Sequence, residues 1–362
     1  MKQIKLFDPR IDKREEKAVK KVLHSHNWAL GAGGEYVKKF EKQFSNFLGV
    51  DNCVAVNSGT ASLHLALSLI EIKNKEVILP SLSFVSTAHA IIYNGGIPKF
   101  VDVDPQTLCI DPEEISNAIT KKTRAIIPVH LGGMPCDLGK ISMISKKYNI
   151  PIIEDAAHSA GAKYNGKRIG THGDLVCFSF HPVKNLAMPS GGAITINSKK
   201  KNEFVNILQA RRWVGISKRN GSIYDVADLG WNYYMNEFSA AIGIEQLKKL
   251  NKTNIQRKKI SKRYYNELKL RDKMPFDKNC SYHFYWIQVK NRKNFMNELK
   301  KNNIETGIHY LPIHKMNFYN SKTKLPITEE ITKRIVSLPT HPNLTENQVE
   351  KIIRLTNKFA KW

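Results

Sequence analysis

Several features are missing from the sequence, and each absence excludes a class of protein. No apolar stretch approaches the length of a membrane-spanning helix. The N-terminus has no apolar run followed by small residues, so we expect no secretory signal. The cysteines are few, odd in number and never spaced as C-x-x-C: Cys53, Cys109, Cys136, Cys177 and Cys280. They indicate neither a disulfide framework nor a zinc site, and we expect small buried thiols in a cytoplasmic protein.

Acidic residues are also scarce. The chain has 57 Lys and Arg against 32 Asp and Glu, a formal net charge of +25. Such a field attracts nucleic acid, anionic lipid or phosphorylated substrates. The lysines are nevertheless dispersed in short groups such as Lys199-Lys200-Lys201, and no basic stripe alternates with stacking aromatics. We interpret them as a solvated surface that mildly favours anionic substrates, and expect neither nucleic acid nor a membrane as a partner.

The histidines form no recognisable set of metal ligands. His24 and His26, like His172 and His181, have no carboxylate or cysteine at the spacing of metal ligands. We expect most of them to be surface or packing residues, and predict no metal site.

What the sequence does contain is an alternation of strands and helices between residues 50 and 200. Helical patterns at 61–70 and 86–94 separate the first strands. The strand patterns are fully apolar, which indicates a sheet covered on both faces. Such alternation predicts an α/β fold with a mostly parallel sheet between helices. The predicted strands are 53–58, 76–81, 99–104, 125–130, 151–157, 175–180 and 193–198.

The length of 362 residues allows two domains. A long helical pattern at 236–270 is followed by a predicted strand at 281–289 and a helix at 292–303. We expect a large domain at 1–247 and a smaller C-terminal α/β domain at 248–362. No linker rich in Pro, Gly or Ser separates them, so we expect the two to pack closely.

Four segments carry residues that could bind a ligand or take part in catalysis. In NSGTASLHLAL (57–67), Ser58, Gly59 and Thr60 stand where a strand passes into a helix. Free N–H groups and the helix dipole bind phosphate at such a position, although these residues also serve as plain caps. Asp155 ends a predicted strand, at the sheet edge where α/β proteins bind ligands, and it is equally suited to cap the next helix.

The other two segments follow further along the chain. SFHPVKN (179–185) carries Lys184 just past a buried strand and is followed by PSGG. LGWNYYMNEFSAAIGIEQL (229–247) has aromatic residues and Asn232 immediately before the long helix.

Together these segments resemble the DegT/StrS group of sugar aminotransferases, which have the aspartate-aminotransferase-type fold (fold type I) and use pyridoxal phosphate (PLP). The group's motifs N-S-G-T-x-A/S-L, P-S-x-T/S-F-x-x-T, E-D-A-A-x, S-F-x-x-x-K-N with Gly-Gly, and G-x-N-Y-R-M-x-E-x-x-A-A-I-G-x-x-Q-L have counterparts in order from 57 to 247. The segments GIHYLPIH (307–314) and SLPTHPNLT (337–345) are similar to the group's ending. The resemblance therefore spans essentially the whole chain.

The resemblance implies a role for each matching residue. Lys184 matches the lysine that bonds to the cofactor and then acts as a base, which requires partial desolvation. Asp155 matches the carboxylate that keeps the pyridinium nitrogen protonated. Gly59 and Thr60 (after Ser58), with Ser179, match the phosphate cradle.

Further matches concern the ring and the substrate. Phe84 matches an aromatic residue that stacks on the cofactor ring, with plain core packing as the alternative. His158 stands where the group often has His or Gln near the ring oxygen. Asn232 matches a residue lent to the phosphate by the neighbouring subunit, which implies a homodimer with shared active sites. His309, Tyr310 and His314 belong to the small domain, from which they could reach the substrate.

Two departures affect substrate or subunit contacts. The group's acidic G-E/D-G-G is Pro189-Ser190-Gly191-Gly192 here, and the arginine of N-Y-R-M is Tyr234. Neither removes a residue that amino transfer needs. Relatives that dehydrate deoxysugars have lost the lysine, so the presence of Lys184 favours amino transfer.

The resemblance implies an aminotransferase that moves an amino group from glutamate, through PLP, to a nucleotide-linked keto sugar. The H-P-x-K form of the lysine segment favours a 4-keto sugar, and the product would be an amino sugar for a polysaccharide, glycoprotein or antibiotic. The alternatives are amino transfer to a non-nucleotide cyclic ketone such as an inosose, and a PLP-binding regulator without turnover. A nucleic-acid-binding protein is a further alternative that rests on net charge alone.

Overall fold

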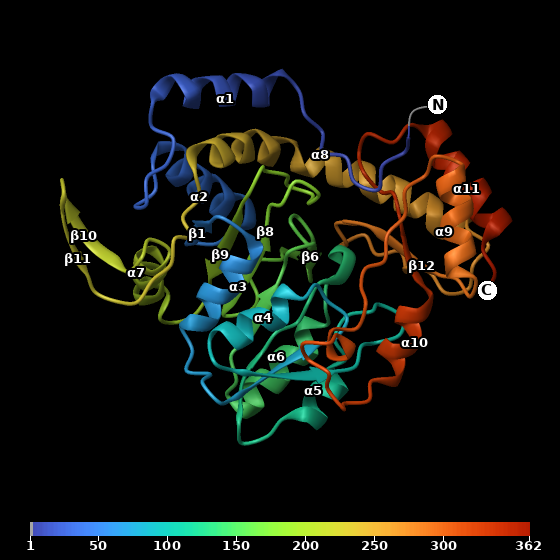
Figure 1. The fold of residues 1–362 in the computed structure, drawn as a ribbon, viewed down its shortest axis with the longest axis horizontal. Helices are drawn as coiled ribbons and strands as arrows, with labels where there is room; N and C mark the ends of the chain where they lie inside the picture. Colours follow the sequence, from blue (N-terminus) through green and yellow to red (C-terminus); the bar gives the residue numbers. More distant parts are fainter. Residues whose placement is uncertain (1–2) are drawn as a thin grey trace.

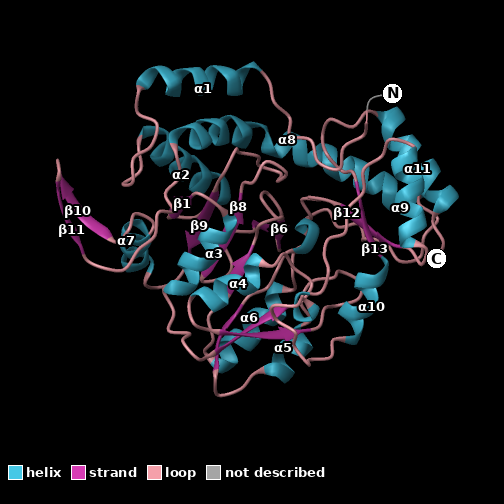
Figure 2. Cartoon of the chain, viewed as in Figure 1, coloured by secondary structure: helices cyan, strands magenta, loops and turns pink. Residues whose placement is uncertain are grey.

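The computed structural model describes residues 3–362 and has helices packed around a central sheet (Figure 1, Figure 2). Within these residues the sheet has a four-stranded part, ordered β1-β9-β8-β5, and a three-stranded part, ordered β3-β2-β4. Two parallel bridges, Ile126 to Ile152 and Val129 to Asp155, join the two parts. The strands are β1 (Cys53–Val56), β2 (Glu76–Pro80), β3 (Ile97–Val101), β4 (Thr123–Ile126), β5 (Ile153–Asp155), β8 (Leu175–Ser179) and β9 (Gly192–Ile196).

The prediction of a mostly parallel sheet is confirmed, and the exception is β9. β2 is parallel to β3 and β4, and β5 is parallel to β8, whereas β9 is antiparallel to both β8 and β1. Alternate residues of a strand enter different cores: Val54 and Val56 belong to one buried cluster, and Ala55 to the other. Both faces are therefore covered, which is why these strands are apolar throughout.

Helices connect the strands as the alternating pattern predicted, with α3 and α4 at the two expected places. The first turn of α3 follows β1 directly, and that of α4 lies a few residues after β2. The α-helices are α1 (Lys13–Ser25), α2 (Glu35–Leu48), α3 (Gly59–Ser68), α4 (Ser86–Tyr93), α5 (Pro112–Ala118), α6 (Leu138–Tyr148), α7 (Lys201–Arg211), α8 (Glu237–Glu267), α9 (Arg292–Lys301), α10 (Pro326–Arg334) and α11 (Glu346–Phe359), with short 3-10 turns η1 (Leu131–Gly133) and η2 (Ile313–Lys315).

Helix α8 is 31 residues long and runs from the central sheet to the C-terminal elements (Figure 1). There β12 (Tyr285–Gln288) pairs antiparallel with β13 (Ile335–Leu338). Asn254 of α8 donates a 2.9 Å hydrogen bond to the carbonyl of Ala160, and the buried Arg257 donates one of 2.8 Å to the carbonyl of Thr340, so the helix is tied to both regions. A boundary at residue 247 falls inside this continuous helix, and the division into 1–247 and 248–362 stays a prediction.

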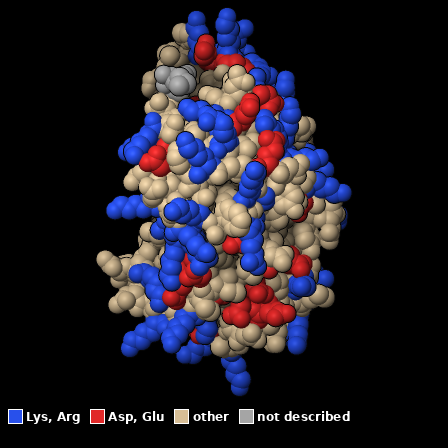
Figure 3. Space-filling view, turned by 90° about the vertical axis from the view of Figure 1, so that its right-hand side faces the viewer, with Lys and Arg blue, Asp and Glu red and all other residues tan. Residues whose placement is uncertain are grey.

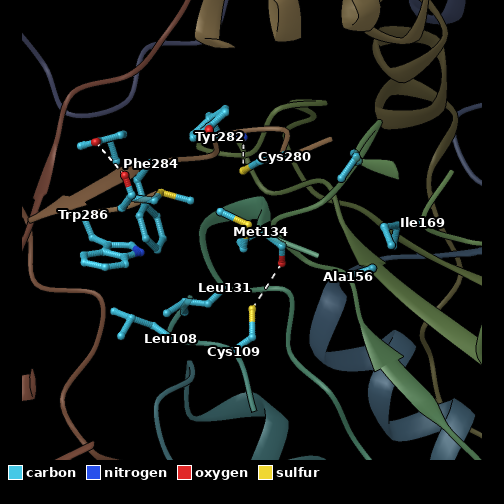
Figure 4. Close-up of a cluster of buried hydrophobic side chains, with 14 of the residues drawn as sticks. Leu108, Cys109, Leu131, Met134, Ala156, Ile169, Cys280, Tyr282, Phe284 and Trp286 are labelled. Carbon is cyan, nitrogen blue, oxygen red and sulfur yellow. Dashed lines mark hydrogen bonds between the residues drawn. The ribbon is translucent and has the colours of Figure 1, made fainter. Parts of the chain in front are cut away.

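The strand predicted at 281–289 is shorter than expected, because the backbone N–H groups of Ser281 and His283 bond to the turn at Gly132 and Gly133 instead of to a neighbouring strand. Figure 4 shows Cys280, Tyr282 and Phe284 beside Leu131 and Met134, in a cluster that includes side chains of the central sheet and the segment before β12. Backbone bonds hold this junction, since His283 N donates to the Gly132 carbonyl at 2.8 Å. All five cysteines are free and buried, as predicted.

A hairpin that the sequence did not predict projects from the body (Figure 1). Its strands are β10 (Ile216–Asn220) and β11 (Ile223–Val226), and Ile223 is 78% exposed. A smaller hairpin joins β6 (Lys163–Tyr164) to β7 (Lys167–Arg168).

The basic side chains are spread over the surface. In Figure 3 they are interrupted by neutral and acidic side chains over the face in view. Several form exposed ion pairs, such as Lys259 and Arg263 with Glu346. Among residues 3–362, no helix combines the length and apolar character needed to cross a membrane.

Candidate active site

A cavity of about 420 Å³ opens where parallel strands of the sheet end. Asp155 and Ser179 are the last residues of the parallel neighbours β5 and β8, which brings them to one edge. Residues from the small C-terminal region close the other side. The predicted site residues in the lining are Ser58, Gly59, Thr60, Phe84, Asp155, His158, Ser179, Lys184, His309 and Tyr310.

A second, more open hollow of about 560 Å³ contains none of these residues. Its lining includes Lys163, Lys167 and Arg168, and it offers charge without a buried amine or a buried carboxylate. Of these two hollows, only the smaller cavity contains the predicted site residues.

Lys184 and Asp155 form the electrostatic centre of this cavity. Burial lowers the pKa of Lys184 to about 8, and the nearby Asp155 carboxylate opposes the shift. A fraction of its amine is therefore neutral, and nucleophilic, near physiological pH. Burial raises the pKa of Asp155, while hydrogen bonds and the charge of Lys184 oppose that rise.

The Asp155 carboxylate is hydrogen-bonded but has no ion pair within the described chain. Thr87 Oγ1 donates to Oδ2 at 2.7 Å, and the N–H of Ala157 donates to Oδ1 at 3.1 Å. A buried carboxylate of this kind can face a protonated ring nitrogen of a bound group.

The start of α3 makes a small polar recess beside Ser179. Ser58 caps the helix by accepting a 3.1 Å bond from the N–H of Ala61. The N–H groups of Gly59 and Thr60 belong to the first helical turn, where the helix supplies no acceptor. A Cβ on Gly59 would lie 2.6 Å from Cβ of Ser179, so only glycine lets the helix start approach that hydroxyl so closely. This recess suits a phosphate group.

His158, His309 and Tyr310 form another part of the cavity lining. His158 Nδ1 lies 3.3 Å from the N–H of Gly132, and Nε2 lies 3.0 Å from the Tyr310 hydroxyl. Burial, followed by the charge of Lys184, holds the pKa of His158 well below its usual range. His309 bonds to Ser337 Oγ at 2.9 Å, and burial lowers its pKa to about 4.

Phe84 is 55% exposed and lies at the rim, with its ring centroid 6.0 Å from that of Tyr310. This exposure argues against plain core packing. Its ring is available for stacking on a ligand.

Two predicted residues are not in the lining. His314 is buried between Ser81 Oγ, at 2.6 Å, and Glu329 Oε1, at 3.2 Å, so it is engaged away from the cavity. Asn232 is exposed, and its carbonyl accepts a 3.2 Å bond from the side chain of Asn57, which does line the cavity. A single chain therefore does not bring the side chain of Asn232 into its own cavity.

The structure also brings in residues to which sequence reasoning gave no role. Thr87 is the final threonine of P-S-x-T/S-F-x-x-T, and that position was the available signal. Phe7 lines the cavity and stacks on His283 at 4.9 Å. No motif near residue 7 indicates that Phe7 belongs to the site, because the residues it contacts lie far along the chain. In the part of the chain from residue 3 onward, no group of three or more His, Cys, Asp or Glu could hold a metal ion.

Comparison with known proteins agrees with this arrangement. The profile of the DegT/DnrJ/EryC1/StrS aminotransferase family matches residues 9–356. The spore coat polysaccharide biosynthesis protein SpsC of Bacillus subtilis is 33% identical over 376 residues, covering 98% of this chain and 96% of its own length.

Solved structures are similar over nearly the whole chain. The putative sugar aminotransferase Spr1654 of Streptococcus pneumoniae, solved in PMP and PLP forms, has a TM-score of 0.92 at 27% identity for both forms, covering 98% of this chain and 97% (PMP form) or 98% (PLP form) of its own. PseC of Helicobacter pylori, an aminotransferase involved in the biosynthesis of pseudoaminic acid, has a TM-score of 0.92 at 27% identity, with 99% of each chain covered.

Fold and matches together define a PLP-dependent aminotransferase of fold type I. The chain belongs to the DegT/DnrJ/EryC1/StrS aminotransferase family, a family of sugar aminotransferases.

Proposed function

We propose that this enzyme moves an amino group from glutamate, through PLP, to a nucleotide-linked keto sugar, with a 4-keto sugar preferred. The observation that carries the proposal is the meeting of Lys184, Asp155 and the start of α3 around one cavity. Sugar chemistry follows from the family, and the nucleotide and the 4-keto position follow from the sequence resemblance alone. By analogy with the relative SpsC, the product would enter polysaccharide synthesis.

Bound PLP supplies a pyridinium ring that absorbs the negative charge developing on the substrate carbon. Lys184 would hold the cofactor covalently and, once released, would carry a proton between the substrate carbon and the cofactor carbon. Its lowered pKa supports both tasks, because only the neutral amine is a nucleophile or a base. Asp155 would keep the ring nitrogen protonated.

The remaining contacts would fix the ring in place. Ser58, Gly59, Thr60 and Ser179 form the recess for the phosphate, and the close approach of Gly59 to Ser179 supports this fit. We further propose that Phe84 stacks on the ring and that His158 lies near the ring oxygen. His309 and Tyr310 would contact the sugar.

We also propose a homodimer with shared sites, in which Asn232 reaches the phosphate bound by its partner. The backbone carbonyl of Asn232 is bonded to Asn57, which lines the cavity, while its side chain is exposed. This exposure supports a contact with another chain. Five free buried thiols support a cytoplasmic location.

The test has two parts. Borohydride reduction of the PLP-loaded protein and peptide mapping should place the pyridoxyl label on Lys184. A label on another lysine would refute the assignment. Nucleotide keto sugars and inososes are then offered with glutamate, and the amino product is identified by mass spectrometry and NMR. Turnover of an inosose alone would make a cyclic ketone, and not a nucleotide sugar, the substrate. Absence of any turnover by unreduced, PLP-loaded protein, with Lys184 identified as the labelled residue in a separate reduced sample, would favour a regulator.

A further inference from the structure

Four nearly parallel rings form a row along one wall of the cavity. Phe7 stacks on His283 at 4.9 Å and 14°, His283 on His158 at 4.6 Å and 27°, and His158 faces Tyr310 at 6.0 Å and 18°. Phe7, His158 and Tyr310 all line the cavity. Packed between two neighbours, the ring of His158 has little freedom to turn over.

The contacts of His158 fix which of its nitrogens carries the proton. The N–H of Gly132 points at Nδ1 from 3.3 Å, and an N–H can only donate, so Nδ1 must be the acceptor. A neutral imidazole carries one proton, which is then on Nε2. Nε2–H therefore donates to the Tyr310 hydroxyl oxygen at 3.0 Å. The lowered pKa of His158 keeps the ring in this neutral form.

This order determines what Tyr310 can do. Its oxygen accepts from His158, so its own proton must go elsewhere. Within residues 3–362 the hydroxyl makes no second hydrogen bond, and the residue lines the cavity. Burial, followed by the charge of Asp155, raises the pKa of Tyr310 far above neutrality, so the hydroxyl keeps its proton.

We propose that Tyr310 is a directed hydrogen-bond donor to an acceptor oxygen of the group bound in this cavity, and that His158 is the positioning residue that sets its direction. The acceptor is the phenolic oxygen of the cofactor or an oxygen of the sugar. The inference rests on the proposed function only in assuming that these ligands occupy this cavity.

The first test uses the protein without cofactor. Long-range ¹H–¹⁵N NMR on labelled protein reports the protonation of each imidazole nitrogen, and His158→Gln identifies the signals of residue 158. We expect a neutral ring with the proton on Nε2 at pH 7. A proton on Nδ1, or a doubly protonated ring, would overturn the proposed direction. This result does not depend on any sugar being a substrate.

The second test reverses the direction by substitution. In His158→Gln the new amide has one acceptor and one donor group and can repeat both hydrogen bonds. In His158→Glu the new carboxylate has only acceptors and would draw the Tyr310 proton toward itself. Dissociation constants are measured for PMP, which cannot bond covalently to Lys184, and for the nucleotide keto sugar. We expect Tyr310→Phe and His158→Glu each to raise the dissociation constant of one of these ligands by roughly three- to tenfold. His158→Gln should raise it much less.

The double variant separates direction from charge. If His158→Glu acts through Tyr310, adding it to Tyr310→Phe should cause no further loss. An equal loss in the Tyr310→Phe background would mean that the new charge acts directly, and would refute the role of His158. Weakened PMP binding identifies the cofactor oxygen as the acceptor, and weakened sugar binding alone identifies the sugar. Unchanged affinity for both ligands in Tyr310→Phe would refute the proposal that Tyr310 donates a hydrogen bond to the bound group.

Discussion

The hydroxyl of Thr87 lies 2.7 Å from Oδ2 of Asp155 and connects the first turn of α4 to the end of β5. Ser83 Oγ lies 2.8 Å from the same hydroxyl and can donate to it. The Thr87 proton has two acceptors, the Asp155 carboxylate and, at 3.1 Å, the Phe84 carbonyl, and the charged and nearer carboxylate is the stronger one. Among the groups that stabilise the ionised form of Asp155, this bond has the largest effect on its pKa.

Replacing Thr87 by Val should therefore raise the pKa of Asp155 further. A carboxylate is functional above its pKa and is lost as the pH falls through it, so the acidic limb of the kcat profile should move to higher pH. We expect kcat at neutral pH to fall by about tenfold, the value of one hydrogen bond to a charged group. Thr87→Ser keeps the hydroxyl and should behave like wild type. An unmoved acidic limb in Thr87→Val would show that Thr87 only fills space.

Asp155→Asn should bind PLP and lose most activity. A neutral amide cannot hold the proton on the ring nitrogen, so the ring no longer absorbs charge. Loss of such a preorganised partner typically lowers the rate by on the order of a hundredfold. The measurements are kcat with glutamate and the absorbance of bound cofactor. Near-normal turnover would mean that another residue faces the nitrogen.

The lowered pKa of Lys184 predicts how fast the protein without cofactor captures PLP. Only the neutral amine bonds to the aldehyde, and its fraction rises as the pH rises through about 8. The rate of covalent capture, followed by absorbance after rapid mixing, should therefore rise through this range and level off above it. A midpoint near that of an ordinary exposed lysine would show that the amine is not desolvated.

Gly59→Ala should weaken binding of the phosphate group in particular. The new Cβ would lie 2.6 Å from Cβ of Ser179, and the helix start must then move away from that strand. We expect the dissociation constant of PLP to rise by about tenfold or more, since several charge-assisted bonds to the phosphate would depend on this spacing. Binding of unphosphorylated pyridoxal is the control and should change little. Equal loss for both ligands would indicate general damage to the fold.

Shared sites predict complementation between two inactive variants. In the proposed arrangement Lys184→Ala would lack the tether, and Asn232→Asp would place a carboxylate against the phosphate. In a mixed dimer, one site would combine intact Lys184 from one chain with intact Asn232 from the other. After subunit exchange, part of the wild-type rate should return, provided that Asn232→Asp is inactive alone. Confirmed exchange without recovered activity would assign Asn232 to its own chain's site.

The sequence predicted those site residues whose position follows from the strand or helix next to them. Asp155 ends one apolar strand and Lys184 follows another, and parallel strands end at one edge of a sheet, so their meeting could be expected. Phe7 could not be found in this way, because its contacts with His283 and His309 join residues far apart in the chain.

Other differences have local physical causes. The hairpin Ile216–Val226 is exposed and its strands mix polar and apolar residues, so it lacks the pattern of a buried strand. His314 stands four residues from Tyr310 in sequence, yet Ser81 and Glu329 hold its ring away from the cavity.

The row of rings formed by Phe7, His283, His158 and Tyr310 has a consequence for synthesis of the protein. A chain leaves the ribosome from its N-terminus, so Phe7 and His158 emerge long before Tyr310. One wall of the cavity is therefore absent until most of the polypeptide has been made. Lys184 emerges earlier, in a site still open to water, where its amine would be more fully protonated and less reactive toward stray aldehydes. Cofactor loading should accordingly be a late event, completed after the C-terminal region has folded back onto the first residues.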